Sequence, residues 1–437
     1  MDPLFVVISV LALVLFFLGL GVYVFIGLLL VSIFSLHFIL DFSFFRIGTI
    51  MATILNRAST SWELSAIPLF VWMGEMMFHT DISSRLFNGL SPMVRRVPGG
   101  LLHTNVIGSA LFASISGSSA ATTATVGQIT LAELDKRGYS RQLAFGSLAG
   151  AGSLGLLIPP SIVMIVYGVL AEVSISRLFA AGVFPGIMLA LMYSGYIAVA
   201  CLVKPQLAPS DPTPVSLLEV IRGIGQLLPL IALMVVVLGL IYTGVATPSE
   251  SAAIGVASTL LLIVLTRQFN LGVMRNALLS SIVTSCMITS LLISAAFLST
   301  AMSYLHVPQN VAALITTLDL SPGGLVLVMA VFYLLLGMFL DGISITVMSL
   351  PITLPLMVSA GFDPVWFGVF MVIMIEMAQI TPPVGFNLFI IQGISKASIA
   401  SVVRASVPFF FIMCAATVIL LYWPDIALWL PNNLYGK

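Results

Sequence analysis

The chain contains two copies of an unusual pair of features: a short stretch of small polar residues, followed by two adjacent prolines within an apolar run. The first copy is the stretch 114–127, which contains Ser-Gly-Ser-Ser, followed by Pro159-Pro160. The second is the stretch 341–346 (Asp-Gly-Ile-Ser-Ile-Thr), followed by Pro382-Pro383. The glycine of the polar stretch precedes the first proline by 42 residues in the first copy and by 40 in the second. This matched spacing predicts an internal repeat.

Other residues support the repeat. At a constant offset of 223 residues, Gly138 corresponds to Gly361 and Pro185 corresponds to Pro408. Residues 204–223 form a polar segment rich in proline, which is typical of a linker. We therefore predict a first repeat over residues 1–203, a cytoplasmic linker over 204–223 and a second repeat over 224–437.

The rest of the chain is too apolar for a soluble protein. Hydrophobic residues make up 60% of the 437 residues and charged residues only 7%, whereas soluble domains carry about 25% charged residues. Apolar runs of about 20 residues are typical of membrane-spanning helices, so we predict an all-α polytopic membrane protein. The formal net charge is zero, which argues against binding to nucleic acid.

In a membrane, the polar stretches and the prolines predict interrupted helices. The segment 101–131 has 31 residues, and two arms of about 15 residues would each extend only about 22 Å. This is less than the hydrocarbon core of roughly 30 Å, so we predict a re-entrant helical hairpin over 101–131 and its counterpart over 325–360. The prolines predict broken helices over 142–173 and 364–394, because proline removes a backbone donor and disrupts a helix interior.

The basic residues predict opposite orientations for the two hairpins. Lysines and arginines flank the first hairpin, so both its ends are expected in the cytoplasm, whereas the second hairpin has no Lys or Arg nearby. If the remaining spans cross the membrane in alternate directions under these constraints, 12 of the 16 basic residues lie on the cytoplasmic side and both termini lie on the outer side. The two repeats are therefore predicted to have inverted topology. The more polar segment 41–63 is expected to be an amphipathic or interfacial connection.

The polar breaks have the chemistry of a site for a monovalent cation. Non-helical backbone at membrane depth is tolerated where it faces protein or a watery cavity, and hydroxyls and free carbonyls there suit Na⁺. The candidate ligands are the hydroxyls of Ser116, Ser118 and Ser119, the carbonyls near Gly155 and Ile158, and the symmetric positions Gly342, Ala378 and Thr381, with Val384 nearby. The alternative is that these small residues only let helices pack closely.

Carboxyl groups in apolar runs cost roughly 2.5–3.5 kcal/mol each on insertion scales and are therefore functional candidates. Asp341 is the best candidate because it lies in the second polar break, and Glu376 also falls in an apolar run. We predict that Ser118, Asp341, Ser344 and Asn387 lie at the hairpin tips or face the substrate. The sequence has no Ser/His/Asp or Cys/His catalytic set and no nucleotide-binding motif, so neither an enzyme nor an ATPase is expected.

Five short motifs resemble the large membrane subunit of a TRAP (tripartite ATP-independent periplasmic) transporter, and the resemblance covers nearly the whole chain. They are residues 66–70 (AIPLF), 116–119 (SGSS), 157–161 (LIPPS), 247–253 (TPSESAA) and 381–387 (TPPVGFN). The resemblance implies an elevator mechanism, in which a domain that holds both hairpins moves against a scaffold, and coupling to Na⁺ without an organic cofactor. It also implies a separate small four-helix (Q-type) membrane subunit and a periplasmic substrate-binding protein.

The resemblance also assigns two cation sites. They map onto Ser116, Ser119, Gly155, Ile158 and Pro160 in the first copy, and onto Gly342, Ala378, Thr381 and Val384 in the second. Ala378 stands where the family more often has glycine, and this change keeps the backbone carbonyl.

The expected function is Na⁺-coupled uptake of a small organic acid or similar solute across the bacterial inner membrane. The alternative is a divalent anion–sodium symporter of the same broad architecture that works without a binding protein. A structural or enzymatic membrane protein would show no Na⁺-dependent flux. A requirement for a binding protein separates the first two hypotheses.

Overall fold

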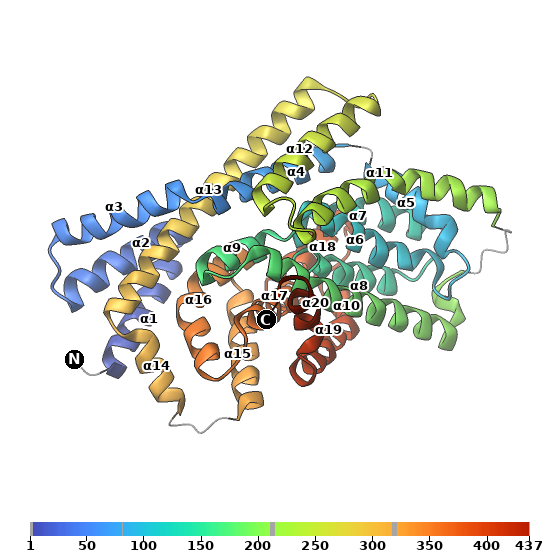
Figure 1. Cartoon of the computed structure of the whole chain (residues 1–437). Helices are drawn as coiled ribbons and strands as arrows, with labels where there is room; N and C mark the ends of the chain where they lie inside the picture. Colours follow the sequence, from blue (N-terminus) through green and yellow to red (C-terminus); the bar gives the residue numbers. More distant parts are fainter. Residues whose placement is uncertain (1–2, 81, 210–214, 317–320, 437) are drawn as a thin grey trace.

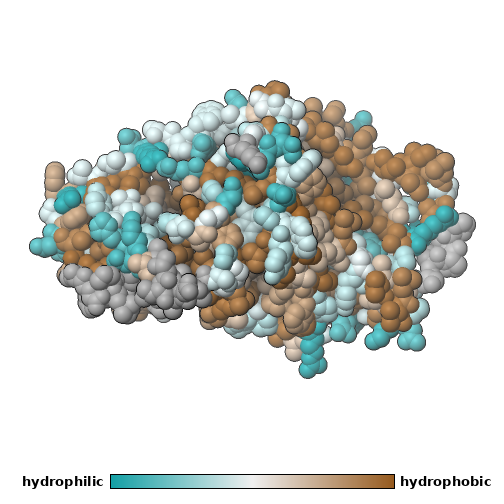
Figure 2. Space-filling view, turned by 60° about the horizontal axis from the view of Figure 1, so that its bottom comes forward, coloured by the Kyte–Doolittle hydropathy of each residue, from teal (hydrophilic) through white to brown (hydrophobic). Residues whose placement is uncertain are grey.

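The computed structural model describes residues 3–80, 82–209, 215–316 and 321–436, and within these ranges every regular element is a helix. Residues 210–214 of the predicted linker lie outside the described ranges. In the described part of the chain, six helices are long and apolar enough to cross a membrane: α10 (Ile175–Val203), α11 (Leu217–Tyr242), α12 (Pro248–Leu265), α13 (Leu271–Tyr304), α16 (Gly342–Ser359) and α19 (Ile399–Tyr422). Figure 2 shows hydrophobic side chains over much of the surface, as expected where lipid replaces water. The all-α membrane prediction is confirmed.

Several helices pack into what we call the scaffold, which consists of α1–α5 and α11–α14. In it, α4 (Ala66–Phe78) packs against α12 and α13, and α5 (Ile82–Val94) packs along α11. A Cβ atom added to Gly89 of α5 would lie 2.8 Å from the Gly223 carbonyl oxygen, and one added to Gly223 of α11 would lie 2.6 Å from the Gly89 oxygen. Glycine at both positions lets the two backbones meet, an arrangement that stabilises helix pairs in lipid.

The N-terminal helices form one end of the molecule. Figure 1 shows α1 (Pro3–Gly19), α2 (Val24–Phe34) and α3 (Phe44–Thr60) there, beside α13 and α14 (Val307–Thr316). The α3 helix is amphipathic, because its apolar positions 47, 50, 51 and 54 pack together towards α2 and α13. The segment 41–63, expected to be an amphipathic or interfacial connection, therefore contains an amphipathic helix, and its location at a membrane interface stays a prediction.

The first predicted hairpin is present. Helices α6 (His103–Ser116) and α7 (Ser119–Lys136) pack against each other and are joined by Gly117 and Ser118. Gly117 ends α6 with a left-handed φ of +57°, which glycine adopts without steric cost. The Oγ of Ser118 accepts the backbone N–H of Ala121 at 3.3 Å and so caps α7. The second arm extends to Lys136, beyond the predicted end at residue 131.

The second hairpin consists of α15 (Pro322–Gly337) and α16, which also pack against each other. Asp341 stands directly before α16, and its Oδ2 accepts the backbone N–H groups of Ile343 at 3.1 Å and Ser344 at 3.4 Å. Its other carboxyl oxygen accepts the Ser344 hydroxyl. Asp341 is therefore the N-cap of α16, where a carboxylate satisfies free donors at the positive end of the helix.

Both diproline segments interrupt helices, as predicted. The first separates α8 (Arg141–Gly152) from α9 (Ile162–Ala171), and the second separates α17 (Pro364–Gln379) from α18 (Phe386–Ser395). The peptide bond between the two prolines is cis in both copies. The environments differ, however: the first break is almost entirely buried, whereas residues 382–384 in the second are exposed.

The hairpins and broken helices, α6–α9 with α15–α18, form what we call the hairpin core. Helix α10 packs on α9 and α17, and α19 packs on α8. The core meets the scaffold where α6 contacts α4. A Cβ added to Gly74 of α4 would lie 3.3 Å from the Cα of Ser116 and 3.4 Å from its carbonyl oxygen. Because Gly74 has no side chain, the end of α6 lies directly against the α4 backbone.

Candidate cation and solute site

The tip of the first hairpin lies against the first helix break. The Ile162 backbone N–H, at the start of α9, donates to the Gly117 carbonyl at 3.4 Å. A Cβ added to Gly117 would lie 2.8 Å from the Pro160 carbonyl oxygen, and one added to Gly155 would lie 2.5 Å from the Cα of Ser119. The absence of side chains at these two glycines therefore brings together Ser119, Gly155 and Pro160, three of the predicted ligands.

Ser119 is the centre of a buried polar cluster. The residue is only 2% exposed. Its Oγ lies 3.0 Å from the Gly152 carbonyl oxygen and 2.8 Å from Oε2 of Glu376. The same Oγ accepts a hydrogen bond of 2.8 Å from Nδ2 of Asn387. Gly152 ends α8 and Asn387 is near the start of α18, so the cluster contains residues from both halves of the chain.

Glu376 is the charged member of this cluster. It is fully buried, and its Oε1 accepts the backbone N–H of Leu156 at 2.8 Å, within the first break. Sequence reasoning preferred Asp341, which is exposed and caps α16. Glu376 was recognised only as a carboxyl in an apolar run, because its partners lie 220 and 257 residues away in sequence.

The other predicted residues of the first copy have different surroundings. Oγ of Ser116 lies 2.9 Å from Oγ1 of Thr122, so this hydroxyl pairs within the hairpin. Ser118 caps α7 and is partly exposed at the tip. Ile158 packs against α10, where a Cβ on Gly186 would lie 2.8 Å from its Cγ1. No hydrogen bond among the described residues joins the Ile158 carbonyl to Ser119, so its role as a ligand stays a prediction.

The second copy of the motif is more exposed than the first. A Cβ on Gly342 would lie 2.8 Å from the Ile375 side chain, and a Cβ on Gly337 would overlap Ala378, so hairpin and broken helix are in contact here too. The Thr381 hydroxyl donates to the Met377 carbonyl at 2.7 Å, and its backbone N–H donates to Ala378 at 3.0 Å. The second site therefore has its hydroxyl already engaged within its own helix.

Val384 and Asn387 both follow the second diproline, but they differ in burial. Val384 is 39% exposed. Asn387 was predicted at the hairpin tips or facing the substrate; it is fully buried and donates to Ser119, the residue that follows the first hairpin tip. It belongs to the buried cluster of the first copy, although it follows the diproline of the second.

The oxygen atoms of the buried cluster are suitable ligands for a hard monovalent cation. They belong to hydroxyl, carbonyl, amide and carboxylate groups, the ligand types that such ions prefer. Two further buried oxygens, Oγ1 of Thr123 and Oδ1 of Asn387, have no hydrogen-bond partner among the described residues. In the same part of the chain, no group of three or more His, Cys, Asp or Glu side chains is arranged to hold a transition metal.

A large cavity lies between the scaffold and the hairpin core. Its volume is about 690 Å³, within the usual range for sites that bind small molecules. It is lined by α3, α13 and α14 on one side and by α9 and α16 on the other, including Arg57, Glu63, Glu172, Ser299, Thr300, Gln309 and Pro351. Arg57 of α3 forms an ion pair of 2.7 Å with Glu172 at the end of α9.

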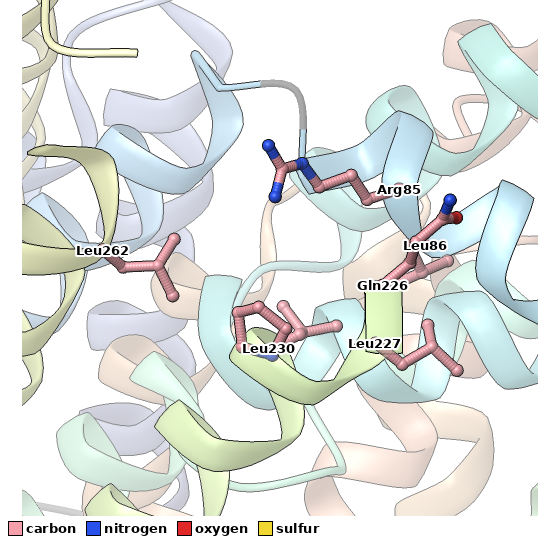
Figure 3. Close-up of a pocket in the computed structure, with 7 residues that line it drawn as sticks. Arg85, Leu86, Gln226, Leu227, Leu230 and Leu262 are labelled. Carbon is pink, nitrogen blue, oxygen red and sulfur yellow. The ribbon is translucent and has the colours of Figure 1, made fainter. Parts of the chain in front are cut away.

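A second cavity is far smaller. It has a volume of about 10 Å³ between α5, α11 and α12, and Figure 3 shows the residues that line it, among them Arg85, Gln226 and Leu262. This is room for about one water molecule. Of these two cavities, only the large one has room for a small-molecule solute.

Membrane-length helices, two helical hairpins and two broken helices together define an elevator-type transporter fold. The fold is similar to that of the Alcanivorax borkumensis YdaH transporter, with a TM-score of 0.60 over 89% of each chain and a sequence identity of 15%. At this identity the likeness shows the fold alone.

The chain belongs to the family described as the DctM component of the tripartite ATP-independent periplasmic transporter, which matches residues 10–426. The C4-dicarboxylate TRAP transporter large permease protein DctM of Pseudomonas aeruginosa is 35% identical over 385 residues, which cover 88% of this chain and 90% of that protein. The isethionate TRAP transporter permease protein DctMQ of Oleidesulfovibrio alaskensis is 31% identical over 380 residues, which cover 86% of this chain and 59% of that protein.

Membership of this family confirms the resemblance drawn from the five motifs. The protein is a multi-pass transport permease of the inner membrane and not an enzyme. Its family performs secondary solute uptake with a binding protein and a small membrane partner.

Proposed function

We propose that this chain is the large permease of a Na⁺-coupled system that takes up a small organic acid delivered by a periplasmic binding protein. The observation that carries the proposal is the buried cluster, in which the Ser119 hydroxyl meets the Gly152 carbonyl and the Glu376 carboxylate. Such oxygens, held away from lipid between a hairpin tip and a helix break, are suited to a coupling ion.

The two cation sites are proposed at the two copies of the repeated motif. Bound Na⁺ would supply positive charge between the hairpin and the broken helix of each copy. The proposed ligands are Ser116, Ser119, Gly155, Ile158 and Pro160 in the first copy, and Gly342, Ala378, Thr381 and Val384 in the second. Close packing of Gly155 on Ser119 and of Gly342 on the α17 helix supports this assignment.

The large cavity is the proposed chamber for the solute. Both the scaffold and the hairpin core line it, so a solute there would contact the domain that moves in an elevator as well as the domain that stays fixed. The Arg57 guanidinium at its wall has the planar donors that pair with a carboxylate. An organic acid is also supported by the C4-dicarboxylate and isethionate named for the two relatives.

The partners and topology are proposed as follows. A separate small four-helix membrane subunit accompanies the chain, in line with the name DctMQ, in which the large and the small component are fused. The first hairpin opens from the cytoplasm and the second from the periplasm, and both termini lie in the periplasm. The distribution of basic residues supports this inverted arrangement.

The test is uptake by vesicles that contain both membrane subunits. With the binding protein and the labelled organic acid that it binds, vesicles should accumulate the acid in a Na⁺ gradient and stop when choline replaces Na⁺. Undiminished uptake in choline would contradict Na⁺ coupling. Uptake by the same vesicles without the binding protein would support the stand-alone symporter instead.

A further inference from the structure

Glu376 is a buried carboxyl group without a cationic partner in the described part of the chain. It is 0% exposed, and the ion pairs found there all involve other acidic residues: Glu75, Glu133, Asp135 and Glu172. Its two hydrogen-bond partners, the Ser119 hydroxyl and the Leu156 backbone N–H, are neutral. Neutral donors lower the cost of burying a carboxylate but leave its charge uncompensated.

When Glu376 is ionised, the oxygens around it are more numerous than the hydrogens available to them. One hydroxyl hydrogen of Ser119 faces two acceptors, the Gly152 carbonyl and Oε2 of Glu376. Oδ1 of Asn387, on the amide that donates to Ser119, is buried and has no partner. Oγ1 of Thr123 is likewise unpaired, and it lies so close to Gly152 that any Cβ there would overlap it. A surplus of buried acceptors is satisfied by a positive ion.

We propose that Glu376 supplies the negative charge of a buried Na⁺ site that it shares with Ser119, Gly152, Thr123 and Asn387. This inference rests on the Na⁺ coupling proposed above, and of the ligands proposed there for the first copy this site contains only Ser119. A single carboxylate balances one monovalent charge, so the site should prefer Na⁺ over divalent cations. Because α7 and α8 come from one half of the chain and α17 and α18 from the other, the ion would join the two halves.

The decisive variant is Glu376→Gln. Glutamine keeps the shape, can accept the Leu156 N–H and can donate to Ser119, so it removes the charge and retains the contacts. The readout is the thermal midpoint of the purified complex of this chain with its small subunit, measured as NaCl replaces KCl at constant ionic strength. No solute is needed, so the measurement is independent of transport.

The expected results differ with and without Na⁺. In KCl, E376Q should unfold at a temperature equal to or above that of the wild type, because glutamine carries no buried charge that lacks a partner. The Na⁺ concentration for half-maximal stabilisation should rise roughly ten- to hundredfold. A residue that only supports the packing would lower the midpoint equally in both salts. An unchanged half-maximal Na⁺ concentration in E376Q overturns the proposal.

Two further variants complete the experiment. Thr123→Val removes an unpaired hydroxyl at nearly constant volume. It should leave the thermal midpoint in KCl unchanged or higher and should weaken the stabilisation by Na⁺. If E376Q does not fold, T123V alone tests the proposed site. Glu75→Gln, at a half-buried carboxyl of scaffold helix α4, is the matched control and should behave as the wild type. If Na⁺ stabilises E376Q and T123V as it does the wild type, this inference is wrong while Na⁺ coupling stands. If Na⁺ does not stabilise the wild type, both are wrong.

Discussion

Arg57 of α3 and Glu172 at the end of α9 form a 2.7 Å ion pair that joins the scaffold to the hairpin core. The two side chains are 81% and 72% exposed, so the pair contributes less than about 1 kcal/mol to stability. Its position matters more than its strength, because movement of the core relative to the scaffold must separate the two residues.

The first prediction concerns this pair. In a background without Cys201, Cys286 and Cys414, cysteines at positions 57 and 172 joined by a reducible crosslinker should abolish uptake, and reduction should restore it. The physical reason is that the crosslink prevents the core from moving past α3. Each single-cysteine variant treated with the same reagent is the control. Full uptake by the crosslinked protein would show that this boundary does not move.

The second prediction concerns the Gly155 contact. Gly155→Ala places a methyl group 2.5 Å from the Cα of Ser119, which should destabilise the protein by about 1–3 kcal/mol through overpacking and weaken Na⁺ binding. Gly239→Ala, in helix α11, is the matched control because nothing lies within 4 Å of its added Cβ. The measurement is the thermal midpoint with and without Na⁺. Equal behaviour of the two variants would contradict the close contact at the tip.

The third prediction compares the two motif copies. Ser119→Ala and Thr381→Val each remove one hydroxyl, and loss of a ligand to a charge is worth about 1.5–3 kcal/mol, or roughly ten- to hundredfold in Na⁺ dependence. Uptake against Na⁺ concentration at matched expression measures it. If both half-saturation values stay at the wild-type level, these residues serve packing alone.

The fourth prediction tests the inverted topology. A cysteine at Arg137, which is exposed at the end of α7, should react with a membrane-impermeant reagent only from the cytoplasm. Asp363 would be the obvious partner, but its Oδ1 accepts two backbone N–H groups and caps α17. Ala360→Cys, exposed beyond the end of α16, avoids that loss and should react only from the periplasm. Reaction of both positions from one face would rule out inversion.

Features that act over a few residues were predictable from the sequence. Ser-Gly-Ser-Ser ends one helix and caps the next, and each diproline breaks the helix in which it stands, so hairpins and breaks were found near their true positions. The same local chemistry could have identified the role of Asp341, because an Asp directly before Gly-Ile-Ser at a helix start is typical of an N-cap.

Contacts between distant segments were not predictable. Glu376 reaches Ser119 across 257 residues, and nothing near it in sequence indicates which oxygens it meets. The burial of Asn387 has the same cause, because α18 contacts α7 only when both halves are folded. The difference between the sealed first break and the exposed second break is likewise a property of packing, since the two motifs are alike in sequence.

The bare backbone contact between Gly74 and Ser116 has a consequence for the speed of movement. Interlocked side chains must be lifted out of their grooves before two helices can slide, and each withdrawal adds to the activation barrier. At this crossing α4 has no side chain to withdraw, so the contact adds little to the barrier for sliding. A larger residue at position 74 would press against the Ser116 backbone and would have to be withdrawn before the helices could slide, so it should slow the movement.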